Sequence, residues 1–277
     1  MSFSRVLVED APRLKYEPDL SLPNRHWGQR KLLMAEIEFL VKFATSDCKT
    51  VVYAGASPGE HVPFLSEMFP KLEFVLYDPR PFGIQSTERI SLKQQFFADK
   101  DAKEFADRKD VLFLSDIRNL PENFKTTVSQ SQIDQNIKKD MKDQMRWHEI
   151  VKPVASLLKF RLPWDDEKTE YLDGELFLPV WGPRSTTECR LAVTGMKTKV
   201  YDNRKYEEQM AYFNRKTRST SFDSVSESHI LSSWLQKNST TDKRDVSHLS
   251  LDITEMFGKN KHRLVQTRHH TIKRRKT

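Results

Sequence analysis

The chain has 277 residues, a length that suits one large domain or a domain with a sizeable appendage. Hydrophobic residues make up 37% and charged residues 31% of the sequence, which still leaves apolar blocks long enough to build a core. No apolar run is long enough to span a bilayer and no apolar signal core is present, so we expect an intracellular protein that is not secreted. The two cysteines, Cys48 and Cys189, and the scattered histidines indicate neither a disulfide framework nor a metal site.

The surplus of positive charge lies at the end of the chain. The sequence has 46 Lys and Arg against 39 Asp and Glu, a formal net charge of +7. Eight of the bases and none of the acids fall within residues 259–277, which leaves 38 bases against 39 acids in residues 1–258. We therefore expect residues 259–277 to form a basic, mobile tail that could hold a phosphate backbone or act as an import signal.

Strands and helices are predicted to alternate along the first half of the chain. Apolar residues recur at helical spacing in two segments, and short β-rich runs precede Gly/Pro turns or acids. This alternation indicates an α/β fold with a mostly parallel central sheet and helices on both faces. The predicted elements are helices over 29–43 and 62–69 and strands over 50–53, 72–77 and 111–114.

The second half of the chain is more polar. The stretch 134–159 suits a charged surface helix leading into Pro153, and 175–180 and 189–193 read as further strands. Residues 198–245 are rich in Ser, Thr and Asn, and we expect a polar excursion there, with 206–215 as its best helical piece and 219–228 as a mobile loop.

A glycine-containing loop, residues 55–59, follows the first predicted strand, and Asp78 ends the next one. Glycines at the end of a first strand let the backbone approach a bound nucleoside, and an acid ending the second strand can accept hydrogen bonds from ribose hydroxyls. Dinucleotide sites and S-adenosylmethionine sites share this geometry, although such a loop is often simply a turn. The spacing is not G-x-G-x-x-G, which disfavours a pyrophosphate cradle and an NAD-dependent oxidoreductase.

Four sequence blocks follow one another along the chain: GQRKLL at 28–33, VVYAG at 51–55 with Pro58, Gly59 and His61, LSDIR at 114–118, and PVASLLKFR at 153–161. Together and in this order they resemble the poxvirus family of cap-specific mRNA 2′-O-methyltransferases, whose members also serve as the small, stimulatory subunit of the viral poly(A) polymerase. The resemblance runs from about Tyr16 to Arg215 and fades beyond.

The resemblance implies a catalytic tetrad of two lysines and two carboxylates, carried by Lys31, Asp116, Lys159 and Glu188. A ribose hydroxyl is a poor nucleophile at neutral pH, so a nearby base or cationic partner must help remove its proton. A lysine can act as this base only if its pKa falls, which burial and a second lysine favour. We expect Lys159 to be the base or oxygen-steering group, Lys31 to tune it, and the two carboxylates to hold the lysines in place.

The resemblance also implies two ligand sites. A 7-methylguanine base carries a delocalised positive charge, so aromatic faces and carboxylates should recognise it, and here Trp164 stands where the family has phenylalanine. Positions that match contacts to S-adenosylmethionine are Gln29, Tyr53, Gly55, Gly59, Asp78, Arg80, Phe97 and Asp116, with core packing as the alternative for Phe97. Positions that match the cap site are Tyr16, Arg161, Trp164, Asp166 and Glu207.

These observations predict a Rossmann-like methyltransferase domain over residues 28–258, preceded by a leader, 1–27, that contributes to the cap pocket. The expected reaction is methyl transfer from S-adenosylmethionine to the 2′-hydroxyl of the first transcribed nucleotide of capped mRNA, in the host cytoplasm or the virion. A catalytically silent cap-binding or poly(A) polymerase accessory protein is the alternative. Expected partners are capped mRNA and a poly(A) polymerase catalytic subunit, but no membrane.

Overall fold

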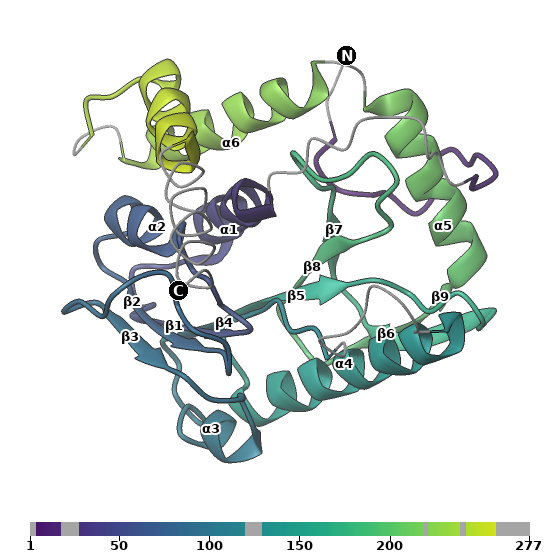
Figure 1. Cartoon of the computed structure of the whole chain (residues 1–277), viewed down its shortest axis with the longest axis horizontal. Coiled ribbons are helices and arrows are strands. Elements are labelled where there is room, and N and C mark those ends of the chain that lie inside the picture. Colours follow the sequence, from purple (N-terminus) through teal and green to yellow (C-terminus); the bar gives the residue numbers. More distant parts are fainter. Residues whose placement is uncertain (1–3, 18–27, 120–128, 219–220, 239–241, 259–277) are drawn as a thin grey trace, which may run out of the picture.

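The computed structural model describes residues 4–17, 28–119, 129–218, 221–238 and 242–258 (Figure 1). The helices are α1 (Gly28–Phe43), α2 (Val62–Met68), α3 (Asp99–Lys103), α4 (Gln130–Val151), α5 (Asn203–Tyr212) and α6 (Phe222–Asn238), with a π-helical turn η1 (Phe213–Thr217) after α5 and a further helix over 246–258. The strands are β1 (Thr50–Ala54), β2 (Glu73–Tyr77), β3 (Ile90–Lys93), β4 (Val111–Ser115), β5 (Ala155–Phe160), β6 (Lys168–Leu172), β7 (Glu175–Phe177), β8 (Cys189–Val193) and β9 (Thr198–Asp202).

Seven strands form one sheet in the order β3-β2-β1-β4-β5-β8-β7, and β6 pairs with β9 separately. The five strands from β3 to β5 are mutually parallel, whereas β8 runs antiparallel to β5 and β7 antiparallel to β8. Strand order reverses at β1, which has β2 on one side and β4 on the other. In open α/β sheets a ligand crevice lies at the carboxyl ends of the strands beside such a reversal. The predicted mostly parallel α/β sheet is therefore confirmed.

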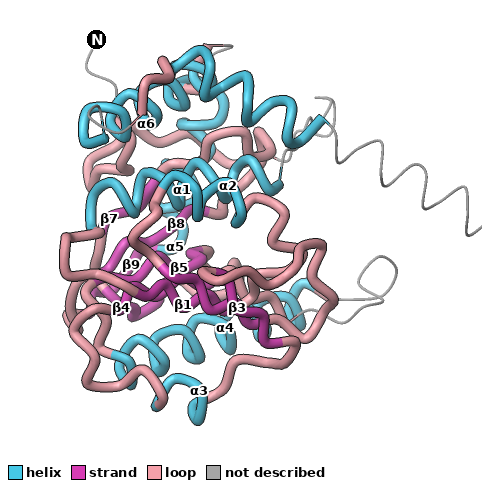
Figure 2. The backbone as a smooth tube through the Cα atoms, turned by 90° about the vertical axis from the view of Figure 1, so that its left-hand side faces the viewer, coloured by secondary structure: helices cyan, strands magenta, loops and turns pink. Residues whose placement is uncertain are grey.

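Helices cover both faces of the sheet (Figure 2). On β1, Val51 and Tyr53 belong to the core under α1, α2 and α6, whereas Val52 and Ala54 belong to the core over α3 and α4. Side chains alternate across a strand, so a strand buried on both faces reads as a continuous apolar run. Among the described residues, no helix is long and apolar enough to cross a membrane.

Two parts of the sequence prediction are wrong. The helix expected to lead into Pro153 is present as α4 and ends at Val151, but the end of the stretch 134–159 is not helical: Ala155–Phe160 is the buried strand β5 between β4 and β8. Lys152 takes a left-handed conformation, with φ 48°, before Pro153, and the residue before a proline is disfavoured in a helix. The loop expected over 219–228 is helical from Phe222 onward, because α6 packs on α1 and buries Ile230, Leu231 and Trp234.

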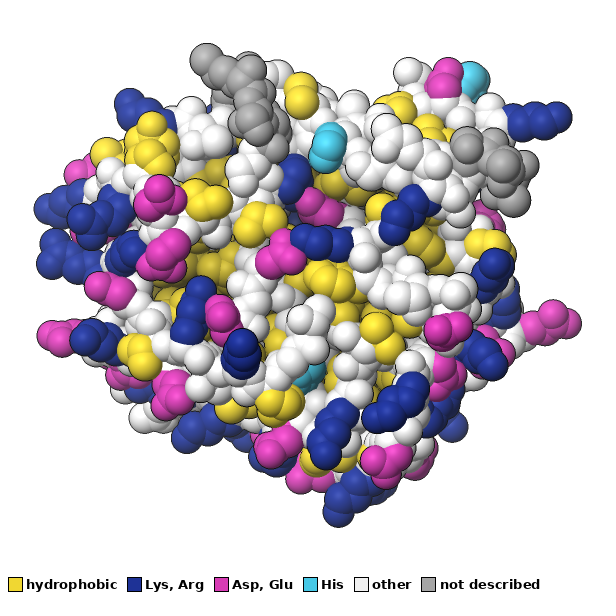
Figure 3. All heavy atoms as spheres, turned by 180° about the vertical axis from the view of Figure 1, so that it is seen from behind, with side chains coloured by type: hydrophobic (Ala, Val, Ile, Leu, Met, Phe, Trp, Pro, Cys, Tyr) yellow, Lys and Arg dark blue, Asp and Glu magenta, His cyan; other side chains and the backbone are white. Residues whose placement is uncertain are grey.

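The other parts of the domain prediction have mixed outcomes. The segment expected as a polar excursion contains β9, α5 and α6 within the described residues. Residues 18–27 of the predicted leader and the predicted tail, 259–277, lie outside the described residues. On the back face, Lys and Arg side chains are interspersed with Asp and Glu over most of the surface (Figure 3). This agrees with the near balance of bases and acids in residues 1–258.

Candidate active site

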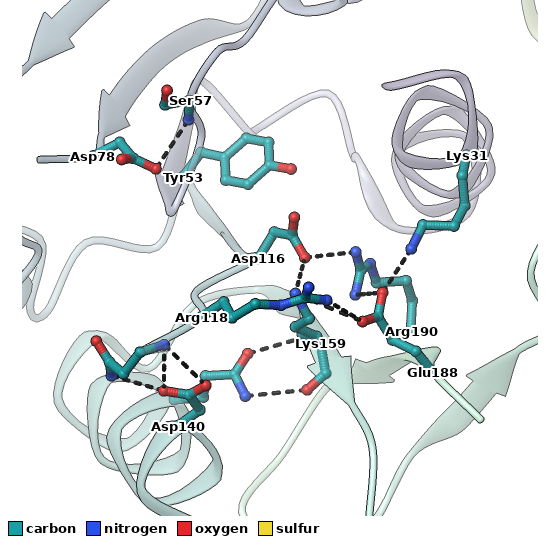
Figure 4. A network of polar contacts seen from close by, with 12 residues as sticks. Lys31, Tyr53, Ser57, Asp78, Asp116, Arg118, Asp140, Lys159, Glu188 and Arg190 are labelled. Carbon is teal, nitrogen blue, oxygen red and sulfur yellow. Dashed lines mark hydrogen bonds and ion pairs between the residues drawn. The ribbon is translucent and has the colours of Figure 1, made fainter. Parts of the chain in front are cut away.

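Four predicted catalytic side chains converge from distant parts of the chain (Figure 4). Lys31 lies on α1, Asp116 directly follows β4, Lys159 lies on β5, and Glu188 directly precedes β8. The amine of Lys31 donates to Glu188 Oε1 at 2.6 Å, and the amine of Lys159 donates to Asp116 Oδ1 at 2.9 Å. Lys159 Nζ also lies 3.6 Å from Glu188 Oε2, so the four groups form one connected cluster.

Two arginines that were not assigned a catalytic role join this cluster. Arg190 of β8 donates to Asp116 Oδ1 at 2.7 Å and lies 3.4 Å from Glu188 Oε1. Arg118 Nη2 donates to Glu188 Oε2 at 3.1 Å, from a side chain that is 55% exposed. Four cations therefore share two carboxylates, and the cluster has a formal surplus of two positive charges.

Burial and neighbouring charge shift the pKa values within the cluster. Burial lowers the pKa of Lys31, whereas the nearby carboxylate of Glu188 opposes this shift. Burial alone would raise the pKa of Glu188 and of Asp116, but the cations around them lower both values, and the pKa of Glu188 falls well below its ordinary range. Both carboxylates are therefore ionised at neutral pH and hold the two amines in place.

The backbone around the two lysines is fixed by buried contacts. Gln144 of α4 accepts from the Lys159 N–H at 3.0 Å and donates to the Lys159 carbonyl at 3.1 Å. β4 ends at Ser115 opposite Leu158, so Gln144 satisfies main-chain groups just beyond the last residue of the β4–β5 ladder. On α1, Arg30 precedes Lys31 and donates to both carboxylate oxygens of Glu227, at 2.6 and 2.8 Å.

The glycine loop lies beside this cluster, at the carboxyl ends of β1 and β4. Gly55 has φ +81°, and an added Cβ would lie 2.7 Å from the backbone carbon of Asp116. Any other residue would therefore be strained here and would push against Asp116. Gly59 is the second loop glycine with positive φ, at +71°.

Asp78 follows β2 on the other side of β1 and is only 2% exposed. Its carboxylate accepts from the Ser57 N–H at 3.1 Å, from the Arg80 N–H at 2.9 Å, and from the Arg80 guanidinium at 2.9 and 3.0 Å. Both oxygens are thus engaged. A ribose diol would have to displace the guanidinium, whose side chain is 64% exposed and can rotate away.

A buried polar chain connects two further predicted cofactor residues. The Tyr53 hydroxyl donates to Glu36 Oε1 at 2.7 Å, and His61 Nε2 lies 3.1 Å from the same oxygen. His61 Nδ1 lies 2.8 Å from Gln29 Oε1. Gln29 and Tyr53 therefore belong to one network between α1 and β1, with Glu36 and His61 as its unassigned members.

Phe97 lies in a different setting from the other predicted cofactor residues. It is 6% exposed and packs among Tyr77, Phe113 and Trp147, with ring centroids 4.9 to 5.6 Å away. These contacts favour core packing, the alternative considered for this residue. Contact with a ligand at this position stays a prediction.

A small pocket of about 160 Å³ opens beside the tetrad. Lys159 and Glu188 form part of its wall, together with Arg118, Arg161 and both apolar and polar side chains of α4. On α4, Asp140 accepts from the Asn119 side chain at 2.7 Å and so secures the segment that carries Arg118. The wall of this pocket thus includes Lys159 together with two arginines.

A larger pocket, of about 450 Å³, contains most of the predicted cap residues. Tyr16, Trp164, Asp166 and Glu207 all line it, whereas Arg161 lies at its border with the guanidinium 5.6 Å from the Trp164 ring centroid. Five carboxylate side chains line this pocket against two basic ones, which favours a cationic ligand. Burial raises the pKa of Glu207, and the negative charge of the neighbouring Glu208 raises it further.

Three aromatic residues line this pocket, and two of them, Tyr16 and Trp164, do not form an open slot. The rings of Tyr16 and Trp164 lie 5.5 Å apart at an interplanar angle of 64°, in edge-to-face contact. A base sandwiched between two rings needs them parallel and about 7 Å apart, twice a van der Waals contact. One ring must therefore move when a flat base enters.

The residues that sequence reasoning missed carry weak local signals. Arg190 is a charged residue inside the apolar strand β8, and Gln144 is a polar residue on the buried face of α4. Each pattern indicates a buried polar contact but not its partner. Among the described residues, no group of three His, Cys, Asp or Glu side chains is placed to hold a metal ion.

Comparison with known proteins identifies relatives over most of the chain. In an alignment of 287 positions, it is 26% identical to the "Cap-specific mRNA (nucleoside-2'-O-)-methyltransferase" of Myxoma virus (strain Lausanne). This alignment covers 87% of this chain and 80% of the relative. The chain is 29% identical over 245 residues to the protein of the same name from Fowlpox virus (strain NVSL), covering 79% and 76%. Bluetongue virus VP4, described as a multifunctional RNA-capping production-line, matches with a TM-score of 0.49 and 14% identity over 76% of this chain and 35% of VP4.

The sequence profile of one family, described as "Poly A polymerase regulatory subunit", matches residues 6–248. This range confirms the resemblance seen in the sequence and extends it past Arg215, through α6. The matched range includes all four tetrad residues and every described residue of the cap pocket. The chain therefore belongs to the family of poly A polymerase regulatory subunits.

Proposed function

We propose that this protein transfers a methyl group to the 2′-hydroxyl of the first transcribed nucleotide of 7-methylguanosine-capped RNA. One observation carries the proposal. The lysine–carboxylate cluster has the carboxyl ends of β1 and β4 on one side, and on the other side a pocket lined by Lys159 and Glu188. This arrangement supports a nucleoside donor on the β1 and β4 side of the cluster and an acceptor on the pocket side. The names of the poxvirus relatives support the same reaction.

The residues at the carboxyl ends of β1 and β2 support S-adenosylmethionine as the methyl donor. When bound, it supplies a methyl group on a sulfonium, and the electrons of the C–S bond stay on sulfur as the ribose oxygen bonds to the carbon. Gly55 allows close backbone approach, and Asp78 offers a carboxylate to the ribose hydroxyls once Arg80 rotates. Gln29 and Tyr53 would hold the donor from the α1 side. We place the reaction in the host cytoplasm or the virion, since the named relatives are poxvirus proteins.

Lys159 is the group assigned to the acceptor hydroxyl. Lys159 is anchored by Asp116 and also forms part of the pocket wall, whereas Lys31 contacts Glu188 from α1. With its amine in the neutral form, Lys159 orients the hydroxyl oxygen and receives its proton as the oxygen bonds to carbon. The surplus positive charge of the cluster attracts the phosphates on either side of the acceptor ribose.

The acidic pocket between Tyr16 and Trp164 is assigned to the methylated cap. Methylation at N7 gives guanine a positive charge, which the carboxylates at the pocket wall and the aromatic faces would stabilise. Unmethylated guanine lacks this charge and should bind more weakly. The cap pocket therefore gives the reaction its specificity, while the tetrad gives its chemistry.

A methyl-transfer assay on three short RNAs tests the proposal: capped with 7-methylguanosine, capped with unmethylated guanosine, and uncapped. We expect transfer to the first RNA at the 2′-oxygen of its first nucleotide, and much less to the others. Lys159→Met should lower kcat by about 10²–10⁴-fold, the contribution of a positioned acid–base group. Lys71→Met, at an exposed position, is the matched control. Equal transfer to all three RNAs, or full activity in Lys159→Met, would contradict the proposal.

A second role, as an accessory subunit of a poly(A) polymerase, is favoured by the family match. Extension of an RNA primer by a poly(A) polymerase catalytic subunit, with and without this protein, tests it. Stimulation that persists in Lys159→Met would show that the two roles use different surfaces. No stimulation by the wild-type protein would argue against the accessory role alone.

A further inference from the structure

α4 carries a buried carboxylate that contacts the loop between β5 and β6. Asp134 is 2% exposed, and its Oδ2 accepts from the Trp164 N–H and from the Asp165 N–H, each at 2.8 Å. Its Oδ1 accepts from the Gln130 side chain at 2.9 Å. A carboxylate that accepts two consecutive backbone N–H groups fixes the direction of the chain at that point.

Two further contacts hold the same loop. One turn along α4, Lys138 donates to Asp166 Oδ1 at 2.8 Å. From the opposite side, the side chain of Asn203 donates to the Pro163 carbonyl at 2.9 Å, and its N–H donates to the Glu167 carbonyl at 3.0 Å. The backbone at Trp164 is therefore held between α4 and the start of α5, although Trp164 itself is 42% exposed.

The same helix also fixes the catalytic lysine. Gln144, ten positions after Asp134 in the sequence, bonds both main-chain groups of Lys159. At about 1.5 Å per helical residue the two anchors lie about 15 Å apart along α4. A single rigid helix thus sets the separation between the aromatic face of the cap pocket and Lys159.

We propose that Asp134 is a positioning residue for cap recognition: it holds Trp164 as the fixed face of the cap pocket, at a set distance from Lys159. Tyr16 is then the face that moves when the base enters, because the two rings are in contact in the structure. This inference rests on the proposed function. It implies that α4, by setting the distance between the cap pocket and Lys159, determines which nucleotide reaches the tetrad.

The test compares Asp134→Ala with the wild-type protein and with Asp143→Ala. Asp143 lies on the same helix, and its carboxylate accepts from Lys139 and Arg146 of that helix at 2.7 and 2.9 Å, so it is a matched control. Affinities for the dinucleotide caps m7GpppG and GpppG are measured by fluorescence quenching, together with KM and kcat for methyl transfer to capped RNA. S-adenosylmethionine affinity and the melting temperature report on the rest of the fold.

We expect Asp134→Ala to lower the preference for the methylated cap by about tenfold, which corresponds to the loss of roughly one charged hydrogen bond. The same variant should raise KM for capped RNA. Values of kcat and donor affinity should stay near wild type. Asp134→Asn retains an acceptor oxygen and should restore part of the preference. A purely structural role would instead lower the melting temperature and kcat together.

Unchanged cap preference in folded Asp134→Ala would overturn the inference, as would a loss of equal size in Asp143→Ala. If Asp134→Ala does not fold, Asp134→Asn decides: a reduced preference with unchanged kcat supports the role, and a wild-type preference refutes it. A wild-type protein that binds both caps equally would refute the proposed function itself. The two failures are therefore distinguishable.

Discussion

Glu188 is the carboxylate on which the charge balance of the tetrad depends most. It lies 2.6 Å from Lys31, 3.1 Å from Arg118, 3.4 Å from Arg190 and 3.6 Å from Lys159. Glu188→Gln would leave Asp116 as the sole carboxylate among these four cations. Because the Glu188 side chain is only 11% exposed, solvent screens the remaining repulsion poorly. Removing one partner of a buried ion pair costs about 3–5 kcal/mol, and we expect a loss of stability of that order at pH 7.

The size of this loss should depend on pH in a defined direction. Burial by itself would raise the pKa of Glu188, but Lys159, Lys31 and Arg190 bring it well below its ordinary value of 4.5. Between the folded and unfolded pKa values, the unfolded chain binds more protons, so stability increases with pH in that window. The stabilisation by Glu188 is thus complete above pH 4.5 and disappears as the pH falls through the folded value.

Urea unfolding of the wild-type protein and of Glu188→Gln, from pH 7 down to the lowest pH at which both fold, measures this dependence. We expect the difference in unfolding free energy to be largest at pH 7 and to shrink below about pH 4.5. Glu175→Gln is the control, because Glu175 pairs with Lys42 at an exposed site, where an ion pair contributes about 0–1 kcal/mol. A difference that is absent at pH 7, or that is the same at every pH, would refute the reasoning.

Two further predictions concern the ligands. Asp78→Ala should weaken S-adenosylmethionine binding by about 10–150-fold, the range for losing a hydrogen bond to a charged group. The melting temperature of this variant reports on the lost contacts with Arg80. An unchanged dissociation constant would place the donor elsewhere. Deleting residues 259–277 should lower RNA affinity for all sequences alike and flatten its salt dependence by roughly 0.7 per lost phosphate contact, with cap preference retained. Equal salt slopes for the intact and truncated proteins would show that the RNA contacts lie in residues 1–258.

The sequence was sufficient where an element is buried on both faces or follows a simple period. β1, β4 and β8 are buried along their whole length and were predicted from their apolar runs. β5 was missed because its apolar residues were read together with the preceding helix, although Lys152 and Pro153 separate the two elements. The α6 helix was missed because its contacts are with α1, which ends at Phe43, far from the start of α6 at Phe222 in the sequence.

The tetrad could be predicted from the resemblance but not from the spacing of its residues. Lys31 and Glu188 are 157 positions apart, and no local pattern shows that their side chains meet. Arg190 and Asp134 escaped notice for the same reason, since each is defined by a partner from a distant segment. Tertiary contacts of this kind become visible only once the order of the strands is known.

The direction of β8 explains why the cluster forms where it does. The carboxyl ends of β4 and β5 place Asp116 and Lys159 at one edge of the sheet. A parallel β8 would put its first residues at the opposite edge, but the antiparallel strand places Arg190 opposite Lys159, with Glu188 just before the strand. The start of β8 thus meets the end of β5, and a carboxylate and a guanidinium join the lysine there. Because β8 is antiparallel, Glu188 and Arg190 lie at the edge of the sheet that carries Lys159. In a wholly parallel sheet, these two residues would lie at the opposite edge.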